Sequence, residues 1–149
     1  MVSGDKAAVE RALEIAKTKG AKRAMLLPVS APFHCSLMQP AADVMARALA
    51  EVTIGKPASP LVSNVLAAPI TDPDEIRRRL IEQVTGTVRW RESVAYMASH
   101  GVTRFFEIGA GKVLSGLVKR IAEGAVGISV GGPNDLNAAK DALAAAQTA

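Results

Sequence analysis

His34 is the residue of this sequence best suited to acid–base chemistry. It stands in the segment Pro28-Val29-Ser30-Ala31-Pro32-Phe33-His34-Cys35-Ser36, directly before an expected helix. Two prolines in this segment exclude regular structure and stiffen the backbone. An imidazole has an ordinary pKa near 6.5 and can accept and return a proton near neutral pH, which makes His34 a candidate general base. On the residue alone, a partly buried histidine bonded to backbone is the favoured alternative.

Two other groups suggest chemistry but have plainer explanations. Cys35 adjoins His34, yet adjacent side chains rarely form a productive pair, so a buried structural cysteine is favoured. The run Gly109-Ala110-Gly111-Lys112 follows an expected strand and invites a phosphate-loop interpretation. Val113 stands where a Walker loop needs Ser or Thr, and Leu114 stands where a dinucleotide fingerprint needs its third glycine. A tight turn between strand and helix explains these glycines better.

Positive charge is concentrated in one part of the chain, although the net charge is only +4. A solvated helix face is the favoured interpretation of this cluster, and a docking site for an acidic partner is the alternative. Aromatic residues make up 3% of the chain and offer few platforms for stacking bases, so no nucleic-acid partner is expected. The basic residues concerned are Arg77, Arg78, Arg79, Arg89 and Arg91.

Composition excludes several other classes of protein. The 149 residues are 49% hydrophobic and 21% charged, which is typical of a folded domain and not of a disordered one. A single cysteine excludes an internal disulfide, and two histidines without matched partners make a structural metal unexpected. No apolar run reaches the ~18 residues that a membrane span requires. We therefore expect a reducing, cytoplasmic setting and no membrane partner.

Helices and strands are expected to alternate and so to position these side chains. Helical apolar spacing, capping residues and short apolar runs define the elements. Expected helices cover 6–19, 37–51, 71–84, 91–99, 113–121 and 134–147, and expected strands cover 24–27, 61–65, 104–108 and 126–130. This order predicts α/β layering with at least partly parallel strands. The 37–51 helix is expected to have one apolar face, formed by Leu37, Ala41, Val44, Met45, Ala48 and Leu49.

Motifs spread over nearly the whole chain carry a resemblance to a known family. They are Val2-Ser3-Gly4, the run from Leu27 to Cys35, Leu37-Met38, Pro60-Leu61-Val62-Ser63-Asn64-Val65, Val88-Arg89-Trp90, Ser93-Val94 and the run from Glu107 to Leu114. In this order and spacing the chain resembles the malonyl-CoA:acyl-carrier-protein transacylases of bacterial fatty-acid synthesis. Related acyltransferase domains occur in polyketide synthases.

The resemblance implies ping-pong transfer of a malonyl group from malonyl-CoA to the phosphopantetheine thiol of acyl carrier protein, with no bound cofactor or metal. It implies that His34 takes the proton of a nucleophilic serine and later activates the carrier thiol. The main-chain carbonyl of Gln83 would orient the imidazole in place of an acidic residue. Phe33 would favour malonyl over methylmalonyl groups, because a bulky ring excludes an extra methyl. Asn64 matches a position near the site, with no role that its residue type reveals.

The resemblance also implies that this chain is the C-terminal half of a larger enzyme. The family's G-H-S-x-G serine elbow does not occur in it, and Arg89 and Arg91 do not match the family's malonate-binding arginine. Residues 1–27 would end a ferredoxin-like small subdomain, and 28–149 would belong to a large α/β-hydrolase-like subdomain. The missing N-terminal half would be a partner, and the chain alone would be inactive. The alternative is a non-catalytic α/β module, or a split-protein partner, that binds an acidic protein such as acyl carrier protein.

Overall fold

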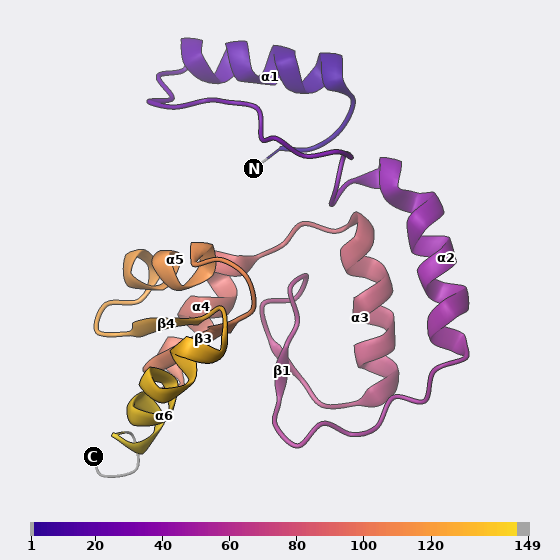
Figure 1. Cartoon of the computed structure of the whole chain (residues 1–149). Helices are drawn as coiled ribbons and strands as arrows, with labels where there is room; N and C mark the ends of the chain where they lie inside the picture. Colours follow the sequence, from indigo (N-terminus) through magenta and orange to yellow (C-terminus); the bar gives the residue numbers. More distant parts are fainter. Residues whose placement is uncertain (1, 146–149) are drawn as a thin grey trace. The chain divides into compact units, whose positions relative to one another are not determined.

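The computed structural model describes residues 2–145 (Figure 1). The chain divides into two compact units, residues 1–89 and residues 90–149. The first unit contains α1 (Lys6–Thr18), a 3₁₀ turn (Ser36–Met38), α2 (Gln39–Ala50), β1 (Leu61–Val62), β2 (Pro69–Ile70) and α3 (Pro73–Thr85). The second contains α4 (Trp90–Ser99), β3 (Arg104–Ile108), α5 (Val113–Ile121), β4 (Val126–Val130), a 3₁₀ turn (Pro133–Asp135) and α6 (Leu136–Ala144). None of the helices within 2–145 is both long and apolar enough to traverse a membrane.

The part of the chain before α2 contains the expected helix but not the expected strand. α1 begins after Asp5, and Gly20 follows its end with a φ of +86°. The run 24–27 is irregular, and the side chains of Met25, Leu26 and Leu27 are 50–53% exposed. The strand prediction is wrong here because a strand needs a neighbour for its backbone groups, and no described residue pairs with this run. The subdomain boundary at residues 27 and 28 stays a prediction.

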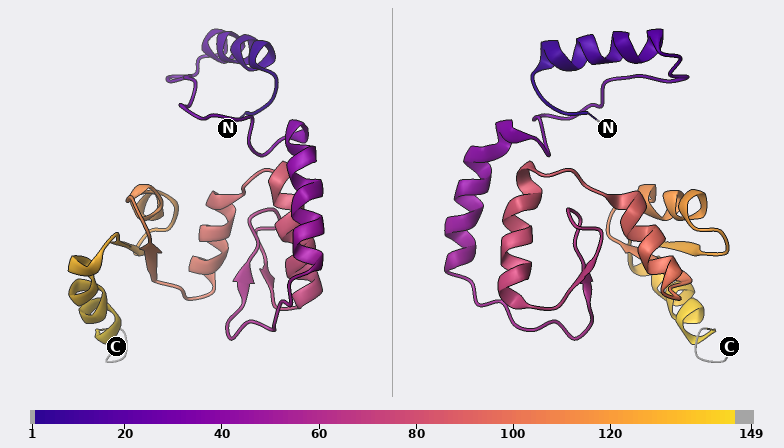
Figure 2. Two further views of the ribbon diagram at one scale, coloured as in Figure 1. Left: turned by 45° about the vertical axis from the view of Figure 1, so that its right-hand side comes forward. Right: turned by 180° about the vertical axis from the view of Figure 1, so that it is seen from behind.

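α2 and α3 lie side by side, as the two views in Figure 2 show. Each buries one residue, Ala42 of α2 and Ile76 of α3. The expected helix is confirmed apart from its first turn, which is 3₁₀, and most of its apolar face is exposed in this structure. Spacing identifies which residues are apolar, whereas the neighbouring element decides which of them are covered. The exposed members of that face are Leu37, Ala41, Val44, Met45 and Ala48, and Leu49 is half-buried.

The strand expected over 61–65 ends early because the chain turns back on itself. β1 stops at Val62 and pairs antiparallel with β2. In the turn, the amide of Ser63 donates to the Ala68 carbonyl at 3.0 Å, and the amide of Ala67 donates to the Ser63 carbonyl at 2.8 Å. Ala67 adopts a φ of +53°, a left-handed conformation that alanine rarely takes. This hairpin, not a longer strand, carries Asn64.

The helix start expected at 71–75 is confirmed in detail. The Asp72 carboxylate accepts a hydrogen bond from the Glu75 amide at 2.8 Å, and Pro73 occupies the first helical position. The acidic residues Asp74 and Glu75 lie in the first turn, where the helix dipole favours negative charge. α3 therefore starts as local sequence rules predict.

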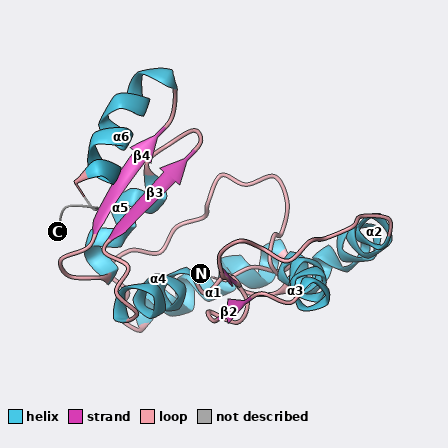
Figure 3. Ribbon diagram, turned by 90° about the horizontal axis from the view of Figure 1, so that it is seen from below, coloured by secondary structure: helices cyan, strands magenta, loops and turns pink. Residues whose placement is uncertain are grey.

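The second unit contains a parallel β–α–β arrangement. β3 and β4 pair in parallel, with Arg104 opposite Val126 and Ile108 opposite Val130, and Figure 3 shows them side by side. α5 connects them and packs on both strands. The expected α4, α5, β3 and β4 are confirmed within a residue at each end. The expected C-terminal helix reaches Ala144, and its predicted extension to residue 147 lies outside the described residues. The core of this unit consists of Val94, Val118, Ala122 and Ala125, with Trp90, Met97 and Phe105 packed against it.

Glu107 lies near the end of β3, and its carboxylate contacts the amides at the N-terminus of α5. One carboxylate oxygen accepts from the Leu114 amide at 3.1 Å and the other from the Ser115 amide at 2.7 Å. These are amides that a phosphate would need, so the tight-turn interpretation of Gly109-Ala110-Gly111 holds. Gly109 and Gly111 have φ values of +132° and +107°, which only glycine adopts easily. The hydrogen bond from the Ser115 amide is the main reason why the pKa of Glu107 lies below its ordinary value.

This depressed pKa makes the second unit sensitive to acid. Ionised Glu107 stabilises the folded state fully above the ordinary carboxyl pKa of 4.5, and this contribution is lost as the pH falls from there through the lower folded-state pKa. We expect the urea midpoint, followed by Trp90 fluorescence, to fall below about pH 4.5. Glu107→Gln should lower the midpoint at neutral pH and flatten its acid dependence. An unchanged pH profile relative to the exposed-site control Glu123→Gln would contradict the assignment.

Candidate active site

His34 is held by a hydrogen bond to a distant part of the chain. Its Nδ1 lies 2.9 Å from the main-chain carbonyl oxygen of Gln83, 49 residues later. The surrounding loop is folded tightly: the Phe33 amide donates to the Ala31 carbonyl at 2.9 Å, and the Cys35 thiol donates to the Pro32 carbonyl at 3.0 Å. His34 itself has a φ of +61°. A left-handed conformation costs a non-glycine residue about 1–2 kcal/mol, and such residues cluster at functional sites.

The Gln83 carbonyl is available because α3 ends two residues later, at Thr85. The last four carbonyls of a helix have no partner within it, and the amide that would continue the ladder belongs to residue 87, outside the helix. The neighbouring Glu82 carbonyl is satisfied locally by the Gly86 amide at 2.8 Å and by the Thr85 hydroxyl at 3.4 Å. The end of the helix thus leaves the Gln83 carbonyl without a partner in α3, and the His34 ring takes that place.

This contact determines which nitrogen of the His34 ring carries the proton. A carbonyl oxygen only accepts hydrogen bonds, so Nδ1 is the donor and holds the hydrogen of the neutral ring. Nε2 then keeps its lone pair and is the atom able to take a proton. His34 is half-buried, so it is not sealed from solvent. The arrangement therefore has the chemistry of an oriented general base.

Asn64 and Gln83 meet through their side chains. Asn64 Nδ2 donates to Gln83 Oε1 at 3.0 Å, so Gln83 contacts His34 with its backbone and Asn64 with its side chain. A cleft of about 220 Å³ adjoins this pair, between β1, the turn after it and one face of α3. Phe33 is 45% exposed in the loop before His34. Of the four site residues predicted from sequence, three are thus joined by hydrogen bonds, and the fourth, Phe33, directly precedes His34 in the chain.

Sequence reasoning passed over the close packing at Gly86, which follows the end of α3. A Cβ placed there would lie 2.8 Å from Val65 Cγ1 and 3.0 Å from the Glu82 carbonyl oxygen. Because its φ of −86° is accessible to any residue, the glycine is needed for this close approach and not for its backbone freedom. A glycine directly after a helix is a common stop signal, so the sequence pattern carried no hint of this packing.

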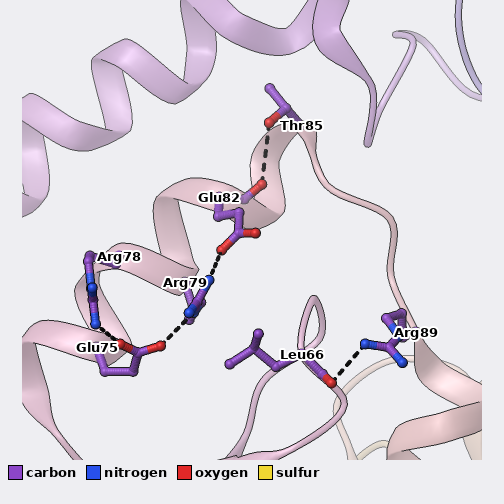
Figure 4. A network of polar contacts seen from close by, with 7 residues as sticks. All are labelled: Leu66, Glu75, Arg78, Arg79, Glu82, Thr85 and Arg89. Carbon is purple, nitrogen blue, oxygen red and sulfur yellow. Dashed lines mark hydrogen bonds and ion pairs between the residues drawn. The ribbon is translucent and has the colours of Figure 1, made fainter.

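Three arginines of the basic cluster are already engaged within their own unit. Arg78 pairs with Glu75, and Arg79 pairs with Glu75 at 2.6 Å and with Glu82 at 2.5 Å, as Figure 4 shows. Arg77 donates to the Val52 carbonyl at 3.0 Å. The carboxylates neutralise much of this charge, which leaves less positive charge for an acidic partner to pair with. The alternative of a non-catalytic acid-binding module gains no support from this surface.

Ser129 has the neighbours of a nucleophile elbow in the sequence. Gly127-Ile128-Ser129-Val130-Gly131 satisfies the general pattern G-x-S-x-G, so letters alone do not exclude a nucleophile from this chain. The nucleophile of such an elbow sits on a sharp strand-to-helix turn that exposes its hydroxyl. Ser129 instead lies within β4, paired opposite Glu107, and no helix begins directly after it. The pattern is therefore part of a strand and not an elbow.

Metal chemistry has no support in the described part of the chain. Among residues 2–145, no three His, Cys, Asp or Glu side chains gather into a group that could hold an ion.

Comparison with known proteins gives a consistent result. No protein-family model matches the chain. It is 46% identical over 139 residues to malonyl CoA-acyl carrier protein transacylase of Escherichia coli K12, covering 93% of this chain and 45% of that protein. The acyl-carrier-protein-S-malonyltransferase of Bartonella henselae matches with a TM-score of 0.89 and 50% identity, over 95% of this chain and 45% of that one. A malonyl-transacylase solved with a type II polyketide acyl-carrier protein matches with a TM-score of 0.84 and 43% identity, over 89% and 43%.

The α/β fold with its parallel strands is the fold of the malonyltransferases. The chain spans less than half the length of the relatives it matches. It corresponds to the C-terminal half of the malonyl-CoA:acyl-carrier-protein transacylases, to which it is related over nearly its whole length.

Proposed function

We propose that this chain supplies the general base of a malonyl-CoA:acyl-carrier-protein transacylase. The observation that carries the proposal is the 2.9 Å contact between His34 Nδ1 and the Gln83 carbonyl, which leaves Nε2 as the basic atom. The solved relative with an acyl-carrier protein bound shows that a related transacylase engages such a partner. The substrates proposed for the complete enzyme are malonyl-CoA and phosphopantetheinylated acyl carrier protein, in the cytoplasm and with no bound cofactor.

In the proposed reaction, His34 takes up a proton twice and releases it twice in each catalytic cycle. Nε2 takes the hydroxyl proton as a serine attacks the malonyl thioester, and the proton then leaves with the coenzyme A thiol. In the second half, Nε2 takes the proton of the carrier thiol as its sulfur attacks the malonyl ester. The serine oxygen recovers that proton as it departs. The same lone pair therefore serves both halves of the cycle.

A carbonyl partner suits this role differently from a carboxylate. It fixes the tautomer and the orientation of the ring, as an aspartate would, but brings no full negative charge to stabilise the imidazolium. The carbonyl belongs to the last turn of α3, where the helix dipole places partial negative charge. We expect weaker imidazolium stabilisation than in a triad with an aspartate.

The chain by itself is expected to transfer no malonyl groups. Its sequence has no G-H-S-x-G elbow, and Ser129 lies in a strand, so the nucleophile is proposed to come from the N-terminal half of the enzyme. Incubation with malonyl-CoA and holo carrier protein should give no turnover above the rate without protein. A polypeptide spanning the N-terminal half of a relative should restore transfer when added. Turnover by the chain alone would refute this division of the site.

Phe33 is proposed to favour malonyl over methylmalonyl groups, because its ring occupies space that the extra methyl would need. One methyl group is worth about 10- to 200-fold in such discrimination. In the complemented enzyme, Phe33→Ser should lower the preference for malonyl-CoA in competition with methylmalonyl-CoA. An unchanged ratio of the two kcat/KM values would remove Phe33 from acyl selection.

A further inference from the structure

Gln83 makes two separate hydrogen bonds, one through its backbone and one through its side chain. Its carbonyl oxygen holds His34, and its side-chain oxygen accepts from Asn64 Nδ2 at 3.0 Å. The proposed proton transfers use only the first of these contacts. The second needs an explanation because it fixes a side chain whose polar atoms could equally well bond to water.

The position of the Gln83 carbonyl depends on tertiary support. It lies in the last turn of α3, where carbonyls lack partners within the helix and where helix ends fray. A small rotation of this turn would redirect the oxygen away from Nδ1. A contact on the Gln83 side chain, outside the helix ladder, opposes that rotation.

Asn64 is well placed to provide such a contact because its own turn is firmly held. The Arg89 amide donates to the Asn64 carbonyl at 2.8 Å, and Arg89 Nη1 donates to the Leu66 carbonyl at 2.9 Å (Figure 4). The 63–68 turn is closed by the two backbone hydrogen bonds described above. It is therefore attached on one side to β2 and on the other to the segment that follows α3.

The same turn also presses against the end of α3. Val65 Cγ1 comes so close to Gly86 that a Cβ there would meet it at 2.8 Å. The turn thus contacts the helix end twice, through an apolar contact at Gly86 and a hydrogen bond at Gln83. The first contact sets the separation, and the second sets the rotation of the Gln83 residue.

We propose that Asn64 is a positioning residue of the transacylase: it holds the side chain of Gln83 so that the main-chain carbonyl of Gln83 keeps the His34 ring protonated on Nδ1. This proposal rests on the proposed function, because the tautomer matters for a base that works through Nε2. Asn64 acts only through Gln83 and is not required to touch substrate.

The tautomer of His34 can be measured directly on the 149-residue chain. Nitrogen-15 NMR of the imidazole rings at about pH 8.5, where imidazole is neutral, distinguishes the two tautomers. The chain has two histidines, and His100→Ala identifies the signals of His34. The wild-type ring should be protonated on Nδ1. Loss of one supporting hydrogen bond, as in Asn64→Ala, should lower the ratio of Nδ1-protonated to Nε2-protonated ring by about fivefold.

A double-mutant cycle separates positioning from general destabilisation. Gln83→Leu keeps the carbonyl but removes the acceptor of the Asn64 contact, so it should lower the ratio as Asn64→Ala does. The double variant should lower the tautomer ratio no further than either single variant, because both substitutions remove the same contact. Asn137→Ala, at an exposed position of α6, is the matched control and should leave the ratio unchanged. If Asn64→Ala fails to fold, Gln83→Leu gives the same readout.

The outcomes are distinguishable. A wild-type ring protonated on Nε2 would overturn the proposed function and the role of Asn64 with it. A wild-type ring protonated on Nδ1, with an unchanged ratio in both Asn64→Ala and Gln83→Leu, would overturn the positioning role alone. Additive losses in the double variant would also overturn it, because they would show two independent effects.

Discussion

Replacing His34 by alanine in the complemented enzyme is expected to lower kcat/KM for malonyl transfer by about 10³-fold, within the range that general acid–base catalysis contributes. Two features place this loss above the lower end of that range. The ring is oriented by the Gln83 carbonyl, and in the proposed reaction the same nitrogen handles the proton in both halves. Alanine removes the base from both steps and leaves the loop backbone in place. The measurement is steady-state transfer from malonyl-CoA to holo carrier protein.

The matched control is His100→Ala. His100 lies just after the end of α4, stacked on Tyr96 with ring centroids 4.1 Å apart, and it is exposed. Its removal should leave transfer unchanged. Malonyl transfer within tenfold of the wild-type rate in a folded His34→Ala variant would show that His34 is not the base. Slowing of only one half-reaction would show that it serves one step and not both.

Replacing Gly127 by alanine should destabilise the second unit by about 3 kcal/mol, the upper end of the usual cost of overpacking. A Cβ at Gly127 would lie 2.3 Å from the Ser115 carbonyl oxygen and 2.7 Å from Ser115 Cα. These are backbone atoms of α5, so no side-chain rotation can relieve the clash. The whole helix would have to move off β4. Such a loss is a large share of the stability of a small domain, which is about 5–15 kcal/mol.

Urea unfolding followed by fluorescence of the single tryptophan, Trp90, measures this effect, because Trp90 packs against the core of the same unit. Gly116→Ala is the control. Gly116 is in α5 next to Ser115, and a Cβ there meets nothing within 4 Å. That substitution should stabilise by about 0.5–1 kcal/mol, because alanine is the better helix former. Equal midpoints for the two variants would mean that α5 does not press on β4 as closely as the structure shows.

Part of the fold could be predicted from local rules because its causes are local. The α3 start follows from Asp72 and Pro73, whose side chain and ring act on the adjacent backbone. The β3, α5 and β4 segments were bounded by glycine turns and apolar runs that behave alike in any context. The prediction of a strand at 24–27 is wrong for the opposite reason. Its apolar run had the right residues, but pairing depends on a second segment that local sequence does not describe.

The candidate site shows the same division. The resemblance assigned His34 and Gln83, and the structure brings them to 2.9 Å of each other across 49 residues. Nothing in the residue type of Asn64 revealed its bond to Gln83, and the glycine after α3 looked like an ordinary stop. For the basic cluster, the carboxylate partners on the same helix become clear only from the ion pairs, and only Arg78 of the three α3 arginines is exposed.

The sequence by itself determined the alternation of helices and strands, the rigid loop around His34 and the likeness to the transacylases. Capping, turn formation and periodicity act over a few residues, so they can be read along the chain. Tertiary structure decided which face of α2 is covered, where β1 ends and what holds the Gln83 carbonyl in place. These depend on which segments meet, because a carbonyl left open at the end of a helix is satisfied by whatever the fold brings within hydrogen-bonding distance.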